Sequence, residues 1–223
     1  TQIWPKIIAI GIHPLYNLSL MKKVLYFINA LENGGAENGL ATLVKHGFFP
    51  PNVDLRITAL SRGDSDLADS LTKVASLTVY TKCNRLTFTA FAIAFVRMPL
   101  TMLKVRPDIV ILSLAQANIL GRFWSIFFPS VHLVAFEHLA ATSSPSIKHS
   151  LYNSLNRLLS FRVDSLWADS DATLVSVRQN YPSNIACHSV PLFVAPNPLP
   201  PSRLLDASEP FTIITACRLV PRK

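Results

Sequence analysis

The sequence predicts an α/β fold in which a parallel β-sheet is flanked by helices. Short continuous apolar segments, such as residues 24–29 (VLYFIN), alternate along the chain with segments whose apolar residues recur at helical spacing. Strands buried on both faces form continuous apolar runs, and parallel neighbours are joined by crossover helices. No fixed repeat period and no low-complexity tract interrupts this alternation.

The first half of the chain contains four expected strands. Residues 24–29 and 109–112 are continuous apolar runs, residues 53–60 alternate apolar with polar side chains, and residues 77–80 form a short run. Between them we expect a helix that begins near Ala36 and stops at Gly47, because glycine is common just past a helix end. Residues 67–71 predict a short helix, and residues 86–104 a longer one with a break near Pro99.

The second half continues the same alternation. We expect helices over 115–128 and 171–180 and strands over 131–136, 165–168 and 189–194. A further helix over 147–161 carries four leucines on one face: Leu151, Leu155, Leu158 and Leu159.

Composition and charge narrow the class of protein. The chain has 223 residues, of which half are hydrophobic and 15% charged, so it is globular rather than disordered. The net charge of +8 favours anionic partners such as phosphates or acidic lipid head groups, with ordinary solubility as the alternative. No basic recognition helix or aromatic-rich basic strand indicates nucleic acid. The cysteines, Cys83, Cys187 and Cys217, form no C-x-x-C pair, which argues against a zinc site or a disulfide framework and for a reducing cytosol.

The ends of the chain differ from its middle. MKKVLYFINA at Met21 reads as a natural opening, so we expect residues 1–20 to be a non-native or disordered extension, or else a short genuine one. Residues 21–195 then form one domain with a Rossmann-like sheet. Residues 196–210 have a linker composition, and residues 211–223 hold the first strand of a second, truncated domain. The apolar segment 86–96 is too short to span a bilayer, and no signal peptide is evident.

A double glycine follows the first strand. Gly34 and Gly35 would allow close approach of a ligand to the backbone, next to the free N–H groups that begin the following helix. The spacing is G-G-x-x-x-G, with Gly39, so the dinucleotide pattern G-x-G-x-x-G is not matched. A tight turn without a ligand explains the glycines equally well. Glu37 in the first turn would stabilise the helix dipole without any further role.

Six segments in order carry a family resemblance: GGAE at 34–37, RPDIVILS at 106–113, FEH at 136–138, LWADSDAT at 166–173, FVAPNPLP at 193–200 and TACRLVPRK at 215–223. With them, residues 22–223 resemble the family 4 retaining glycosyltransferases, which have the two-domain GT-B architecture. Cys217 and Asn38 depart from the family pattern, which usually has glycine and arginine there. The sequence also stops before the family's E-x7-E region, which puts independent activity in doubt.

The resemblance implies transfer of a sugar, with retention, from a nucleotide-diphosphate sugar to a saccharide or lipid-linked acceptor, without a cofactor or metal. It implies that His138 contacts the acceptor or the transferred sugar as the candidate catalytic residue. Donor or acceptor binding would fall to Gly34, Gly35, Glu37 and Glu137, and the leaving diphosphate to Arg218 and Lys223. Each of these residues also has an ordinary structural explanation, as a turn glycine, a hydrogen-bonded histidine or a surface charge.

Three readings of the function stay open at this point. The first is a glycosyltransferase fragment, inactive alone. The second is a non-catalytic binding module that pairs with a separate donor domain. The third is another enzyme of the same architecture, such as a sugar-nucleotide epimerase.

The basic residues Arg85, Arg97, Lys104 and Arg106 around an apolar helix suit a cytoplasmic location at the inner face of a membrane, although an ordinary half-buried helix would look the same.

Overall fold

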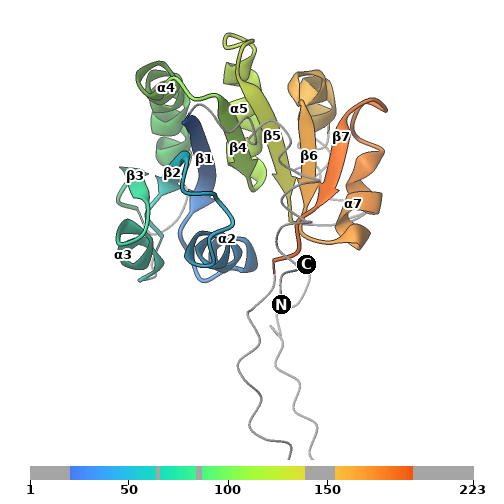
Figure 1. Ribbon diagram of the computed structural model, residues 1–223. Coiled ribbons are helices and arrows are strands. Elements are labelled where there is room, and N and C mark those ends of the chain that lie inside the picture. The colour runs from blue at the N-terminus through green and yellow to red at the C-terminus, as the bar shows by residue number, and fades with distance from the viewer. Residues whose placement is uncertain (1–20, 64–65, 84–86, 139–153, 193–223) are drawn as a thin grey trace, which may run out of the picture.

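The computed structural model describes residues 21–63, 66–83, 87–138 and 154–192. They form a single seven-stranded sheet in the order β3-β2-β1-β4-β5-β6-β7, and every neighbouring pair of strands is parallel. Figure 1 shows the strands side by side from β3 to β7, with helices on either side of the sheet. The prediction of a parallel α/β fold is confirmed. The expectations for residues 1–20, 196–210 and 211–223 lie outside the described residues.

The strands and helices alternate as the sequence predicted. The strands are β1 (Lys22–Ala30), β2 (Val53–Ser61), β3 (Ser76–Thr81), β4 (Ile109–Ser113), β5 (His132–Glu137), β6 (Ser165–Ala168) and β7 (Ala186–Ser189). The helices are α2 (Gly35–Lys45), α3 (Leu67–Thr72), α4 (Phe88–Val105), α5 (Ala115–Ser125) and α7 (Asp171–Arg178), with a 3-10 turn, η2, over Leu159–Arg162.

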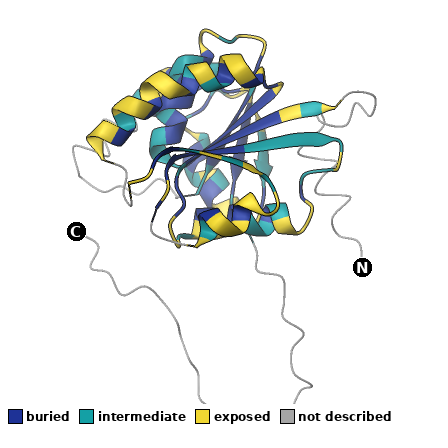
Figure 2. Cartoon of the chain, turned by 90° about the vertical axis from the view of Figure 1, so that its left-hand side faces the viewer, coloured by how far each residue is buried: buried dark blue, intermediate teal, exposed yellow. Residues whose placement is uncertain are grey.

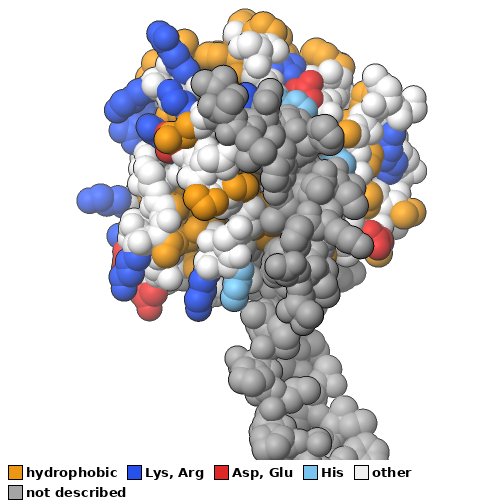
Figure 3. Space-filling model, viewed as in Figure 1, with side chains coloured by type: hydrophobic (Ala, Val, Ile, Leu, Met, Phe, Trp, Pro, Cys, Tyr) orange, Lys and Arg blue, Asp and Glu red, His pale blue; other side chains and the backbone are white. Residues whose placement is uncertain are grey.

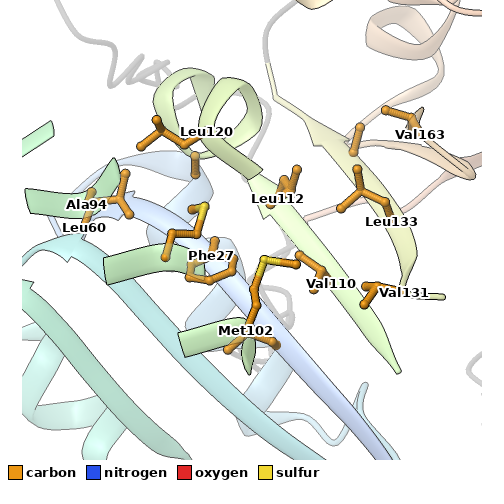
Figure 4. Packing of buried hydrophobic residues seen from close by; sticks show 14 of the residues in the cluster. Phe27, Leu60, Ala94, Met102, Val110, Leu112, Leu120, Val131, Leu133 and Val163 are labelled. Carbon is orange, nitrogen blue, oxygen red and sulfur yellow. The ribbon is translucent and has the colours of Figure 1, made fainter. Parts of the chain in front are cut away.

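Alternate residues of each strand pack on opposite faces of the sheet. In β1, Tyr26 and Ile28 join a core with Leu40 of α2 and Leu71 of α3, so these helices cover one face. Leu25 and Phe27 belong to a second core with buried residues of α4, α5 and α7 on the other face. Figure 4 shows Phe27 in this second core near Leu60, Ala94, Met102, Val110 and Leu112. Figure 2 shows the buried sheet between the two helical layers.

The predicted break in the longest helix is wrong. Helix α4 runs without interruption from Phe88 to Val105 and contains Pro99. A proline inside a helix removes one backbone hydrogen bond and crowds the preceding turn, which costs about 3 kcal/mol. The inner side of α4 outweighs this cost, because Ala94, Met98 and Met102 are 0–1% exposed against the sheet.

Two other boundaries also differ from the prediction. The last strand is Ala186–Ser189 rather than 189–194, since its residues pair with β6 from Ser165 onward. Residues 154–158 are helical as expected, but the chain then continues as the 3-10 turn η2; Leu158 is 69% exposed, whereas Leu159 is buried. The start of that predicted helix, with Leu151, lies outside the described residues. Gly47 ends α2 with φ +70°, as predicted for a glycine in this position.

Candidate functional site

The strand order places a topological switch point between β1 and β4. The helix that follows β1, α2, packs on one face of the sheet, whereas α5, which follows β4, packs on the other. In open parallel sheets, ligands bind outside the carboxyl ends of the strands at such a point of reversal. The side chains at the carboxyl ends of β1, β4, β5 and β6 are therefore the first to consider.

The double glycine follows β1 at this switch point, and its two glycines have different surroundings. Gly34 is the N-cap of α2, and a Cβ atom there would lie 2.2 Å from Oε2 of Glu37. A Cβ atom on Gly35 would meet nothing within 4 Å. Gly34 thus makes room for the Glu37 carboxylate, while the open space beside Gly35 leaves the backbone accessible. Gly39 is a packing position, because its Cβ atom would collide with Leu192.

The carboxylate of Glu37 occupies the first turn of α2. Glu37 is 8% exposed and stands three residues after the N-cap, the position from which a glutamate folds back over the start of a helix. Burial raises the pKa of its carboxyl group, and the neighbouring Glu32 carboxylate raises it further. Because this carboxylate already lies at the positive end of the helix, the start of α2 is not a free site for a phosphate.

Three polar side chains follow three adjacent strands: Ser113 ends β4, His138 follows β5 and Asp169 follows β6. The Ser113 hydroxyl and Nε2 of His138 are hydrogen-bonded at 2.8 Å, and Nδ1 of His138 lies 3.9 Å from Oδ2 of Asp169. The imidazole also packs against Phe136, with 4.2 Å between the ring centroids. The strand ends therefore hold one histidine between a hydroxyl and a carboxylate.

The imidazole of His138 is neutral at physiological pH. Burial lowers its pKa from 6.5 to about 4, although the Asp169 and Glu137 carboxylates act in the opposite direction. Its Nδ1 is buried and has no hydrogen-bond partner among the described residues. A buried ring nitrogen without a partner is costly, so among the described residues this atom is a candidate position for contact with a ligand.

Two more buried polar atoms lie on the same face of the sheet. Nε1 of Trp167 also lacks a hydrogen-bond partner within the described part of the chain, and the buried hydroxyl of Tyr26 lies beside Ser113; both side chains belong to the core under α2. Burial raises the pKa of Tyr26, a hydrogen bond with the Ser113 side chain acts in the opposite direction, and the Glu37 carboxylate adds to the rise, so the phenol keeps its proton. Donors of this kind can hydrogen-bond to ligand hydroxyls as well as to phosphate oxygens.

Glu137 lies on the opposite face from His138, because successive side chains of a strand alternate. One of its oxygens accepts hydrogen bonds from Nη2 of Arg122 at 3.0 Å and from the Tyr181 hydroxyl at 2.6 Å. Arg122 is 0% exposed and also binds Oδ1 of Asn118 at 3.0 Å, the carbonyl of Asn156 at 3.1 Å and the Tyr181 hydroxyl. Glu137 and His138, which the sequence placed in one site, therefore belong to two different sites on opposite faces of the sheet.

Arg122 was not among the sequence candidates, although one signal was present. It lies four residues after Asn118 and is the one charged residue of α5, and polar residues four apart share one side of a helix. On a helix that covers a sheet, such a pair indicates a buried polar contact.

The start of α5 is fixed to the end of β1 by hydrogen bonds. The side-chain amide of Asn29 accepts a hydrogen bond from the Ala117 backbone N–H at 2.8 Å and donates to the side chain of Gln116. Leu114, just before α5, has φ +71° and ψ 166°, a conformation that is costly for any residue except glycine. Asn118 donates to the Leu114 carbonyl at 3.0 Å, which helps hold this turn.

Two predicted contacts to the diphosphate, Arg218 and Lys223, lie outside the described residues. Among the described residues, no group of three His, Cys, Asp or Glu side chains could hold a metal ion.

The fold matches solved structures, whereas no protein-family model and no curated protein matches the chain. HepE from Anabaena, in complex with UDP-glucose, gives a TM-score of 0.56 at 15% identity over 76% of this chain and 43% of that one. The lipopolysaccharide outer core galactosyltransferase WaaB gives 0.53 at 16% identity over 72% and 43%. A UDP-N-acetylglucosamine 2-epimerase gives 0.53 at 14% identity over 74% and 47%.

These similarities define the architecture. The described sheet and helices resemble half of a GT-B fold, the two-domain arrangement of such glycosyltransferases and epimerases. The chain spans less than half of the length of each of these three structures. At these identities the similarity concerns the fold, and the activity has to be argued from the site.

Proposed function

We propose that the described domain is the acceptor-binding half of a retaining glycosyltransferase that uses a nucleotide-diphosphate sugar. The observation that carries the proposal is the row formed by Ser113, His138 and Asp169 at the carboxyl ends of β4, β5 and β6, with Nδ1 of His138 buried and unpartnered in the described part of the chain. HepE, part of which has a similar fold, was solved in complex with UDP-glucose, which supports a nucleotide sugar as the donor.

The charges at the site favour the acceptor side of the reaction. The row consists of the Asp169 carboxylate and the neutral side chains of Ser113 and His138, and Glu37 places a further acidic group at the start of α2. They offer acceptors and neutral donors to sugar hydroxyls and no positive charge to a diphosphate. The diphosphate would instead meet cations outside this row, and Arg218 and Lys223 remain the candidates.

In this proposal His138 is the candidate catalytic residue. A hydroxyl of the acceptor or of the transferred sugar would bind at Nδ1, while Ser113 fixes the ring through Nε2. The reaction moves the glycosyl group from the diphosphate oxygen to the acceptor hydroxyl, and the nucleoside diphosphate leaves. Gly35 would let the ligand approach the backbone, and Glu37 would keep a phosphate away from the start of α2.

The matched control lies at the other end of the same strand. His132 begins β5 and pairs through Nε2 with the Ser165 hydroxyl at 2.9 Å, so the two His–Ser pairs differ chiefly in the edge of the sheet that they occupy. Burial also lowers the pKa of His132. Saccharide binding can be measured from the line broadening of a panel of mono- and oligosaccharides in NMR spectra. The affinity should fall at least about tenfold in His138→Asn, as for the loss of a buried hydrogen bond. His132→Asn should bind as the wild type does. Equal loss in both variants, or no binding by the wild type, would refute the assignment.

A second candidate function is favoured by the epimerase structure, whose TM-score of 0.53 is close to that of the transferase structures. Incubating the chain with nucleotide sugars and analysing the products separates the readings. A glycosylated acceptor with released nucleoside diphosphate indicates a transferase, whereas an epimerised nucleotide sugar without an acceptor indicates an epimerase. Binding of saccharide without turnover indicates a binding module.

A further inference from the structure

The side of α4 that faces away from the sheet is apolar. Phe88, Val96, Leu100 and Leu103 are 85%, 60%, 58% and 58% exposed. With Ala92 they follow each other at intervals of four and three residues, so they form one row along the helix. We call this row the outer face of α4. Figure 2 shows exposed residues along the outward side of the helix, whose opposite side is buried on the sheet.

Apolar side chains of α5 extend this surface. Phe95, beside the outer face, contacts Phe123 and Trp124, with ring centroids 5.6 and 4.9 Å apart. Trp124 in turn contacts Phe127, which is 63% exposed and follows the end of α5. A continuous exposed apolar surface of this kind on a globular domain indicates an interaction site.

The charges along α4 are all positive. The helix contains Arg97 and Lys104, followed by Arg106 at its C-cap, and no Asp or Glu occurs between Phe88 and Val105. All three cations are exposed. Figure 3 shows Lys and Arg side chains gathered with hydrophobic ones in the upper left of the view, where Figure 1 places α4. Positive charges at the margin of an apolar helical face are complementary to anionic lipid head groups.

Length and composition alone would allow Phe88–Val105 to cross a membrane. Its packing shows that it lies along the domain instead. Ala90, Ala94, Met98 and Met102 are 0–1% exposed against the sheet, so the helix cannot enter lipid from all sides without leaving the fold. Only the outer face is available, which is the arrangement of a helix that lies in the plane of a membrane surface.

We propose that the outer face of α4 docks the protein on an anionic lipid bilayer. The apolar row would enter the boundary between head groups and acyl chains, and Lys104 and Arg106 would lie among the anionic head groups. The alternative occupant, a second copy of the chain, is disfavoured because both copies carry a net charge of +8 and would oppose like charges at the same helix. The proposal does not depend on the proposed function.

The test is co-sedimentation of the full 223-residue chain with vesicles of phosphatidylglycerol and phosphatidylcholine, compared with phosphatidylcholine alone. We expect binding to the anionic vesicles that weakens as salt is raised, because charge attraction at a surface is screened. Lys104→Gln should lower the partition coefficient about fivefold, the usual effect of one basic residue near such a surface. Leu100→Glu should lower it about tenfold or more, since the side chain would no longer enter the apolar boundary.

Val175 supplies the control. It is 78% exposed on α7, far from α4 in the sheet order, so Val175→Glu adds the same charge at another exposed apolar position without touching the outer face. This variant should bind vesicles nearly as the wild type does, and unfolding curves of all variants would show that the fold is intact. Equal loss in Leu100→Glu and Val175→Glu, or no binding by the wild type, would overturn the proposal. Dimerisation in analytical ultracentrifugation that Leu100→Glu abolishes, without vesicle binding, would assign the surface to a second copy and also overturn it.

Discussion

Removing Arg122 should destabilise the domain far more than removing an arginine from an exposed ion pair of equal length. Arg122 Nη2 and Glu137 Oε1 are 3.0 Å apart, with side chains 0% and 12% exposed. Arg62 Nη2 and Asp69 Oδ1 are also 3.0 Å apart, with side chains 46% and 66% exposed. Breaking a buried pair leaves the remaining charge uncompensated and costs about 3–5 kcal/mol, whereas an exposed pair contributes about 0–1 kcal/mol.

The assay is urea unfolding of the full chain. With a slope of about 2 kcal/mol per molar urea, Arg122→Met should lower the midpoint by roughly 1.5–2.5 M, and Arg62→Met by less than about 0.5 M. The double variant Arg122→Met/Glu137→Gln should recover part of the loss, because the isolated charge is removed together with its partner. If Arg122→Met costs no more than Arg62→Met, the reasoning from burial is wrong.

Three further predictions test particular positions. Because burial lowers the pKa of His138 to about 4, below the 6.5 expected when unfolded, its contribution to stability is complete above about pH 6.5 and is lost as the pH falls toward 4. Urea unfolding at several pH values should show a loss of about 3 kcal/mol that is absent in His138→Asn. Gly35→Ala should stabilise the domain by about 0.5–1 kcal/mol, because the added Cβ atom meets nothing within 4 Å. Gly34→Ala should destabilise the domain, because the new Cβ atom displaces the Glu37 carboxylate. Thermal unfolding of the two variants distinguishes these outcomes. Pro99→Ala should stabilise the chain by about 1–3 kcal/mol in the same assay, because α4 regains a backbone hydrogen bond.

Apolar periodicity was sufficient to predict the order of the strands and helices. The strand over 165–168 was predicted with its observed bounds, because four apolar or small residues there end abruptly at Asp169 and Ser170. The last strand was misplaced because its residues, ACHS, are not strongly apolar and pair only with β6. Its register is set by a neighbour that local sequence does not reveal.

The site was predicted less completely than the fold. The position of His138 at a strand end was expected from its residues, but its partners Ser113 and Asp169 come from neighbouring strands that are distant in sequence. Glu137 was expected beside it, and the alternation of side chains in β5 sends it to the other face, where Arg122 holds it. Strand alternation could have separated Glu137 from His138 in advance, whereas the contacts across strands required the sheet.

The proposed site and the proposed membrane surface lie on opposite sides of the sheet. Glu37 and Ser113 face the α2 side, whereas α4 covers the other face, so substitutions in one should leave the other intact. His138→Asn should lose saccharide binding and keep vesicle binding, and Leu100→Glu should show the reverse pattern. Co-sedimentation and ligand-observed NMR on both variants measure the two activities separately. Simultaneous loss of both activities in a variant that unfolds like the wild type would contradict this separation, because positions more than about 10 Å apart that share no partner act independently.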